Sequence, residues 1–172
     1  METTDSDKHW YVVLTRTNSE RKVRDYFQLQ EVDTFLPVQN RVIEREGKRI
    51  ERERLLLPRM VFVHISRQEM AAVRSTLNVY DFLRDRSPGA PTSIPDSQMS
   101  DCRYMLDYSQ DQVILTGESI PKGTRVVVAK GDLQGLRGEL VRYNNKYHIL
   151  VRIDMFGSAM VTIPASYVRK EK

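Results

Sequence analysis

The sequence has little of several features that define common protein classes. Cys102 is the single cysteine among 172 residues, so no disulfide can form within the chain. No apolar run approaches the ~20 residues that a membrane-spanning helix needs, and the first ten residues, METTDSDKHW, lack the apolar core of a signal peptide. The three histidines are scattered, without metal-ligand spacing. We therefore expect a cytoplasmic protein with no membrane association, no metal and no other cofactor.

Residue groups that support catalysis are also missing. The segment VVVAKGDLQGLRGELVR (126–142) contains three glycines, but their spacing and the absence of a Gly-Lys-Ser/Thr sequence fit neither nucleotide-binding motif. Strand-like segments flank them, so we expect Gly131 and Gly135 to supply positive φ angles in a turn and Gly138 to allow a bulge or a close backbone approach. Cys102 falls on the apolar face of an expected short helix, which favours a core role over that of a nucleophile. The sequence predicts that the protein is not an enzyme.

Charge of one sign is not in large excess. The net charge is +4, with 17 basic against 16 acidic residues in 1–106 and 10 against 7 in 107–172. Neither part is a polycation, so indiscriminate binding to phosphates is not expected to dominate the function.

The first two thirds of the chain show alternating strand and helix patterns. Branched and aromatic residues predict strands, helical spacing of apolar residues predicts amphipathic helices, and Gly47 at the centre of a charged segment predicts a hairpin. Capping-box spacings place Thr17 with Glu20 and Ser66 with Glu69 at two helix starts. We expect an α+β fold, with an antiparallel sheet flanked by helices. The expected strands are 9–15, 34–43, 54–66 and 78–85, and the charged hairpin is expected at 44–54 with its turn near 46–48. The expected helices are 18–30, a second that begins at 66 and buries Met70, Val73 and Leu77, and a third at 96–106 that buries Met99, Cys102 and Leu106.

The last 50 residues contain only strand patterns. Five short strands separated by regular turn residues predict a small closed β-barrel. A polar stretch precedes them and is expected to link two domains. We expect residues 1–8 to be disordered, 9–106 to form one domain, 107–119 to form a linker and 120–172 to form the barrel.

Lys130, Gly131, Gly135 and Gly138 resemble a KOW motif, which is an SH3-like barrel element. In chain order, WYVVLT, SERKVRDYF, the charged hairpin, LLLPRMVFV, IPDSQMSD and RIDMFGSAMVTIPASYVRK resemble the NusG family over residues 9–106 and 120–170. The family's Pro-Gly-Tyr becomes Pro58–Arg59–Met60, and the usual aromatic of the KOW loop is Leu133. These departures point to a specialised paralogue similar to the antiterminators of capsule-polysaccharide operons.

The resemblance implies a transcription elongation factor that binds RNA polymerase across its clamp helices and gate loop and suppresses pausing and termination. The alternative is a KOW-containing RNA- or ribosome-binding module without a polymerase role. Alternation along LLLPRMVFV separates Leu57, Arg59, Val61 and Val63 from Leu56, Pro58, Met60 and Phe62. The resemblance implies clamp contacts at Leu14, Leu57, Pro58, Met60 and Phe62 with Arg16 at the rim, and gate-loop contacts at Arg74 and Ser75; core packing or a solvated helix end is the alternative for each.

Two further surfaces follow from the same resemblance. The hairpin, with six basic residues and four glutamates, is expected to approach non-template DNA or nascent RNA, unless its charges only pair across the strands. In the barrel, the loops of the family that bind Rho or a ribosomal protein correspond to Leu133, Leu136, Met155 and Phe156, for which barrel-end packing is the alternative. A monomer is the expected state. The basic residues of the hairpin are Arg41, Arg45, Lys48, Arg49, Arg52 and Arg54.

Overall fold

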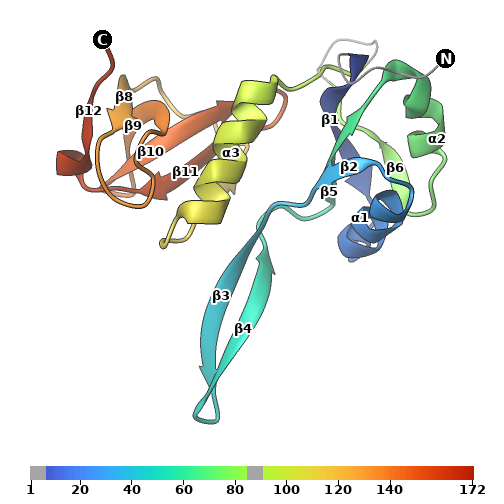
Figure 1. Ribbon diagram of the computed structural model, residues 1–172, viewed down its shortest axis with the longest axis horizontal. Helices are drawn as coiled ribbons and strands as arrows, with labels where there is room; N and C mark the ends of the chain where they lie inside the picture. The colour runs from blue at the N-terminus through green and yellow to red at the C-terminus, as the bar shows by residue number, and fades with distance from the viewer. Residues whose placement is uncertain (1–6, 85–90) are drawn as a thin grey trace. The chain divides into compact units, whose positions relative to one another are not determined.

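The computed structural model describes residues 7–84 and 91–172 (Figure 1). It is a mixed α/β structure with few helices, and every strand pair is antiparallel. The chain divides into two compact units that interleave along the sequence: residues 1–37 with 57–96, and residues 38–56 with 97–172. Within the described residues, no helix combines the length and the apolar character that a bilayer crossing requires.

The first unit is a four-stranded sheet carrying two helices. Its strand order is β2-β5-β1-β6, with β1 (His9–Thr15) central beside β5 (Met60–Ile65). Helix α1 packs on β2 and β5, and helix α2 on β6. The fully buried side chains of Val13, Val61 and Ile65 form part of the sheet's core. The remaining elements are α1 (Glu20–Leu29), β2 (Asp33–Phe35), the 3-10 turn Arg67–Glu69, α2 (Met70–Arg74) and β6 (Val79–Phe82).

The second unit contains the charged hairpin, a helix and a six-stranded sheet. The hairpin pairs β3 (Val38–Arg45) with β4 (Lys48–Leu55). Helix α3 spans Asp96–Tyr108, with Met99, Cys102, Met105 and Leu106 buried. The sheet order is β12-β8-β9-β10-β11-β7, and β7 does not pair with β12 among the described strands, so the sheet is open. Its strands are β7 (Ile114–Thr116), β8 (Thr124–Val128), β9 (Arg137–Tyr143), β10 (Lys146–Ile153), β11 (Gly157–Thr162) and β12 (Val168–Lys170), with a 3-10 turn at Ala165–Tyr167.

Most of the predicted elements are confirmed, and the differences have local causes. All five C-terminal strands form, but the sheet is not closed, and a sixth strand, β7, arises within the stretch expected to be a linker. The predicted strands 34–43 and 54–66 are each interrupted, the first at Leu36–Pro37 and the second at residues 56–59. Pro37 cannot donate to a strand ladder, and Arg59 adopts φ +63° in a turn.

Three predictions about helices are wrong. Helix α1 follows Ser19 rather than Thr17, and Ser19 makes no side-chain capping bond. The second helix has only five α-helical residues after its 3-10 turn, so Leu77 lies beyond it and is 84% exposed rather than buried. At that turn, the Ser66 hydroxyl donates to the Glu69 carboxylate at 3.2 Å, in place of the expected capping box.

Candidate functional site

A hollow of about 680 Å³ opens in the first unit where β1 and β5 end. Leu14 of β1 lies directly opposite Met60 of β5, so their side chains are on the same face of the sheet. The hollow brings together four residues that the sequence proposed as one surface, and it is lined by Leu14, Thr15, Arg16, Thr17, Pro58, Arg59, Met60 and Tyr80.

The turn at Pro58–Arg59, which lines this hollow, is fixed by hydrogen bonds to both backbone groups of Arg59. The backbone N–H of Arg59 donates to Oε1 of Glu20 at 2.9 Å, and its carbonyl accepts from the Thr15 N–H at 2.9 Å. Glu20 is only 4% exposed and stands in the first turn of α1, where the positive end of the helix dipole favours a carboxylate. These bonds hold Arg59 in a left-handed conformation that a non-glycine residue adopts at a cost.

Tyr80 is a member of this hollow that sequence reasoning missed. Its ring is 73% exposed. Leu14 pairs with Asp81 and Thr15 with Val79, so Tyr80 is the extra residue of a β-bulge in β6. A bulge changes the direction in which a side chain points, and the sequence VYDF gives no indication that a bulge occurs here.

Two of the residues proposed for the same surface are buried in this structure. Phe62 is 1% exposed and its ring lies 5.8 Å from that of Phe35. Leu57 is 8% exposed. The interruption at Pro58–Arg59 also breaks the alternation that had placed Leu57 and Arg59 on the same side of one strand.

The hairpin separates its charges between its two faces. Glu46 and Gly47 have φ angles of +55° and +75°, as a two-residue turn between antiparallel strands requires. Residues directly opposite across the ribbon share a face, and the pairs include Arg41 with Arg52 and Arg45 with Lys48. One face therefore carries five cations around a central Ile43–Ile50 pair and no carboxylate; these cations are Arg41, Arg45, Lys48, Arg52 and Arg54.

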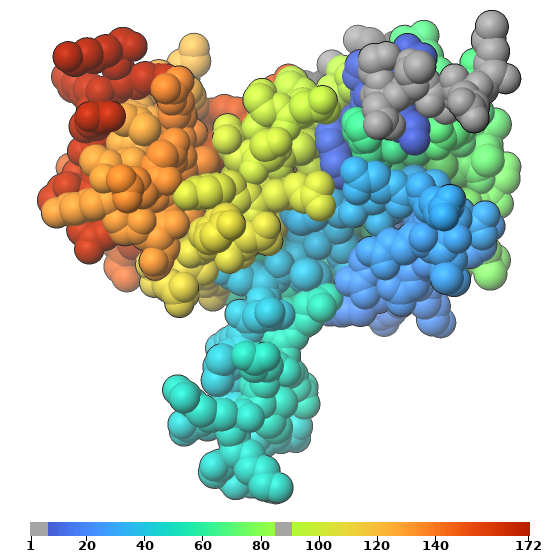
Figure 2. Space-filling model, in the orientation of Figure 1, coloured from blue at the N-terminus to red at the C-terminus, as the bar shows by residue number. Residues whose placement is uncertain are grey.

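The opposite face carries the glutamates of the two strands. Glu44 lies opposite Arg49, and Glu51 and Glu53 lie on the same side. Among the residues that the structure describes, none of the six hairpin cations is held in an ion pair. Figure 2 shows the ribbon's side chains, cyan to turquoise, exposed along its length. We call the cationic side, defined by Arg41, Arg45, Lys48, Arg52 and Arg54, the basic face.

Comparison with known proteins identifies the family. Residues 8–103, more than half of the chain, match the family described as "Transcription termination factor nusG". The chain belongs to the NusG family. No curated protein sequence matches this chain.

One solved structure supports the assignment of the fold. The structure described as "Domain interaction in Thermotoga maritima NusG" aligns with a TM-score of 0.52 at 21% identity, over 98% of this chain and 100% of that one. The two MjSpt4:Spt5 complex structures align over 94% and 95% of this chain, and over 95% and 98% of theirs, at 14% identity with TM-scores of 0.33 and 0.31, too low to indicate a shared fold. The NusG family is one of transcription factors rather than enzymes.

Arg74 and Ser75, at the end of α2 in this NusG-family protein, contact their own unit. Arg74 Nε lies 3.2 Å from Oδ1 of Asp81, and its guanidinium is 5.6 Å from the Phe82 ring centre. The Ser75 hydroxyl donates to the Ala71 carbonyl at 2.9 Å. Burial opposes ionisation of Asp81, but the Phe82 N–H and the two arginines, Arg84 and Arg74, outweigh it and lower the pKa of that carboxyl. These contacts fasten α2 to β6.

Gly131 and Gly135 lie between β8 and β9 and Gly138 lies within β9, and no helix follows them, as predicted. Gly131 and Gly135 have φ angles of +91° and +93°. A Cβ on Gly138 would lie 2.5 Å from the Leu150 carbonyl oxygen, so this glycine permits a close approach of two strands. The prediction of two turn glycines and one close approach is confirmed.

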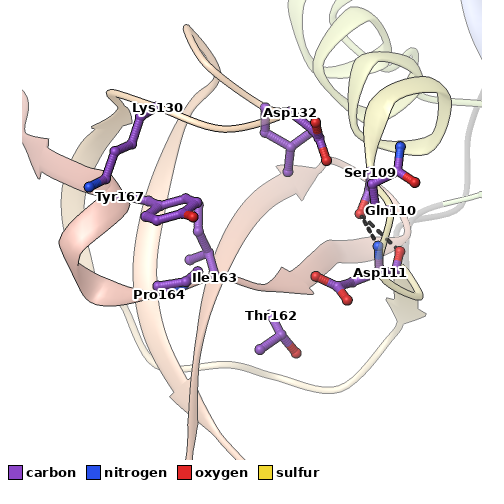
Figure 3. Close-up of a pocket in the computed structure, with 10 residues that line it drawn as sticks. Ser109, Gln110, Asp111, Lys130, Asp132, Thr162, Ile163, Pro164 and Tyr167 are labelled. Carbon is purple, nitrogen blue, oxygen red and sulfur yellow. Dashed lines mark hydrogen bonds between the residues drawn. The ribbon is translucent and has the colours of Figure 1, made fainter.

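Beside these glycines lies a second hollow, of about 70 Å³ (Figure 3). Lys130 Nζ lies 5.0 Å from the Tyr167 ring centre, a favourable cation–π geometry. On the opposite side, the Ser109 hydroxyl donates to the Asp111 carbonyl at 2.9 Å. At about 70 Å³, this hollow offers little room for a ligand.

The proposed partner-binding loops of the second unit lie beside α3. Leu133 and Leu136 are buried, and Met155 and Phe156 are half-buried. The Tyr104 hydroxyl donates to the Gln134 carbonyl at 2.8 Å. The Gln98 side chain exchanges two hydrogen bonds with Asp154, accepting from its N–H at 2.7 Å and donating to its carboxylate at 3.1 Å.

The described residues contain no group of His, Cys, Asp or Glu that could hold a metal ion. Burial raises the pKa of Cys102 to about 12, so its thiol is protonated at neutral pH. One charge pair has a bidentate geometry: Arg152 donates to both carboxylate oxygens of Glu139, at 2.8 and 3.0 Å. That bond, against the opposing effect of burial and helped by the Gly123 N–H, lowers the pKa of Glu139.

Proposed function

We propose that this protein is a NusG-type elongation factor that binds RNA polymerase across the clamp helices and the gate loop. The observation that carries the proposal is the hollow of the first unit, where Leu14, Pro58 and Met60 form an apolar floor beside Arg16 and Tyr80. An apolar centre with a polar and aromatic rim is typical of a protein-binding surface. Its volume admits side chains projecting from a helix.

Binding at two points explains the proposed effect on transcription. The hollow contacts the clamp helices, while Arg74 and Ser75 face the gate loop. A factor that binds one arrangement of two mobile parts more tightly than others increases the population of that arrangement. Pausing and termination then decrease, and no catalytic step is required. In this proposal, residues 9–106 contain the polymerase-binding surface, and residues 120–172 form an SH3-like KOW domain whose sheet, open in this structure, gains the strand β7 from the linker 107–119.

The basic face of the hairpin is proposed to contact non-template DNA or nascent RNA. Like charges directly opposite on a ribbon destabilise it, and here Arg41 faces Arg52 and Arg45 faces Lys48. A row of phosphates would relieve that repulsion. This favours a nucleic-acid contact over the alternative in which the hairpin charges only pair with each other.

A specialised role, antitermination of long operons such as capsule-polysaccharide loci, is proposed from the sequence departures at Pro58–Arg59–Met60 and Leu133. Leu133, Leu136, Met155 and Phe156 are proposed to form the site for a ribosomal protein or Rho. Since Leu133 and Leu136 are buried, binding there would require the neighbouring loops to open.

The test is binding of the full chain to a purified bacterial RNA polymerase elongation complex. Met60→Asp places a carboxylate in the apolar floor and is expected to weaken binding at least about tenfold, because burying an unpaired charge costs several kcal/mol. Leu29→Asp is the matched control, since Leu29 is 81% exposed on α1 and outside the hollow. Circular dichroism establishes that both variants fold.

Either of two results would contradict the proposal. Equal binding by folded Met60→Asp and wild type would mean that the hollow is not the contact. No binding by folded wild type, together with RNase-sensitive association with ribosomes, would favour the alternative function of an RNA- or ribosome-binding module.

A further inference from the structure

A third hollow lies at the root of the hairpin, within the second unit. Its volume is about 210 Å³, many times the roughly 10–15 Å³ that a single water needs. The hairpin contributes two arginines of the basic face, and the segment after α3 contributes the other wall. The lining residues are Gln39, Asn40, Arg41, Arg54, Gln110, Asp111 and Gln112.

One glutamine fixes the geometry of this root pocket, as we call the hollow lined by those seven residues. The Gln39 carboxamide donates to the Asp111 carbonyl at 2.8 Å and accepts from the Val113 N–H at 2.8 Å. It thereby binds one carbonyl and one N–H of the irregular segment 111–113, which precedes β7. The segment carrying Gln110 and Gln112 is held against the hairpin without using any other side chain of the pocket.

The remaining polar side chains are unoccupied. Among the described residues, Arg41, Arg54, Gln110 and Gln112 make no side-chain hydrogen bond or ion pair within the protein. Guanidinium groups donate hydrogen bonds and stack on flat rings, whereas carboxamides both donate and accept. A pocket for phosphate alone would need only the cations and would not include the Asp111 carboxylate. The added carboxamides match the mixed donor and acceptor edge of a nucleobase.

We propose that the root pocket binds one unpaired nucleobase of a single strand whose phosphates follow the basic face. The inference rests on the nucleic-acid role proposed for the hairpin and adds to it a preference for single strands. From Arg41 to Arg45 the basic face extends about 13 Å at about 3.3 Å per residue, enough for a few nucleotides. A base can enter the pocket only when it is neither paired nor stacked in a duplex.

The test compares single strands with duplexes of the same length, as DNA and as RNA, each fluorescently labelled and titrated with the full chain. Charge alone favours the duplex, because its phosphates are more densely spaced. A pocket that binds an unpaired base should instead make the affinity for the single strand higher than that for the duplex. We expect the wild type to bind a 12-nucleotide single strand of mixed sequence about tenfold more tightly than the duplex, the scale of one stacked base. The RNA and DNA arms identify which strand is preferred.

Two variants separate the pocket from the phosphate contacts. Gln110→Ala combined with Gln112→Ala keeps the net charge and every cation of the basic face but removes two carboxamides of the pocket, and should abolish the single-strand preference while leaving duplex binding unchanged. Arg45→Gln combined with Lys48→Gln removes two charges at the far end of the ribbon. That variant should weaken both forms and lower the salt dependence, but keep the preference.

The outcomes distinguish the two proposals. Binding in which the pocket variant retains the wild-type ratio of single-strand to duplex affinity would overturn the base pocket and leave the basic face intact. No binding of either form by the folded wild type would overturn the nucleic-acid role of the hairpin itself, and the base pocket with it.

Discussion

Glu20 is expected to stabilise the first unit and to shape the hollow through one hydrogen bond. Its carboxylate accepts the Arg59 N–H at 2.9 Å from a buried position. A hydrogen bond to a charged group contributes about 1.5–3 kcal/mol, and a carboxylate in the first turn of a helix about 0.3–1 kcal/mol. Alanine regains a few tenths of a kcal/mol in helix propensity. Glu20→Ala should therefore lower the free energy of unfolding of this unit by about 2 kcal/mol.

Urea unfolding followed by tryptophan fluorescence measures this change in the right part of the molecule. Trp10 is the chain's single tryptophan, lies in β1 and is 6% exposed. Its signal reports on the first unit even if the second unfolds separately. Glu20→Gln keeps an oxygen acceptor but loses the charge, and should cost about half as much.

The same variant should weaken polymerase binding. The bond from Glu20 offsets the cost of the left-handed conformation at Arg59, and without it the turn that carries Pro58 is free to relax. Asp25→Ala is the control, since its carboxylate pairs only at the surface with Arg24 and should cost no more than about 1 kcal/mol. If Glu20→Ala and Asp25→Ala had the same unfolding midpoint, the proposed role of the bond would be refuted.

Three further predictions concern the second unit. Gly138→Ala should destabilise it by about 1–3 kcal/mol, because the new Cβ would collide with a backbone oxygen, that of Leu150, which cannot rotate away; thermal unfolding by circular dichroism measures this, and an unchanged transition would contradict it. The pKa of Glu139 is lowered by its bond to Arg152, so its contribution to stability is complete above the unfolded pKa near 4.5 and is lost as the pH falls through the lower folded value. Glu139→Gln should accordingly reduce the difference in stability between pH 7 and pH 3, and an unaltered difference would count against it. Cys102, with a pKa of about 12 and a buried sulfur, should react with a thiol reagent at neutral pH only after unfolding, and rapid labelling of the folded protein would show otherwise.

Regular elements could be predicted from the sequence because each follows from a local period. Alternating residues and Gly47 predicted the hairpin and its turn, and the apolar spacing of Met99, Cys102 and Leu106 predicted the buried face of α3. The interruption before Met60 could not be predicted in the same way. Pro58 within LLLPRMVFV indicates a disturbed strand register, but these letters do not indicate the turn at Arg59, whose N–H donates to Glu20, 39 residues earlier.

The candidate site shows the same limit. Leu14, Pro58 and Met60 could be proposed from resemblance, but Tyr80 enters the hollow only because β6 contains a bulge whose position depends on its pairing with β1. The root pocket could not be predicted from the sequence either. Gln39 and Val113 are 74 residues apart in the chain, and no local pattern indicates that a carboxamide will hold that segment.

The basic face depends on a parity relation that the turn sets. Opposite residues of the hairpin have numbers that sum to 93, so odd-numbered residues of β3 share a face with even-numbered residues of β4. The basic residues of β3 are at odd positions. Three of the four in β4 are at even positions, namely Lys48, Arg52 and Arg54, whereas Glu51 and Glu53 are odd. A turn longer by one residue would bring the glutamates onto the face of Arg41 and Arg45. The two-residue turn at Glu46–Gly47 is therefore what converts a nearly neutral sequence into a ribbon with one cationic side, and the opposition of like charges on that side is the cost that an anionic partner would offset.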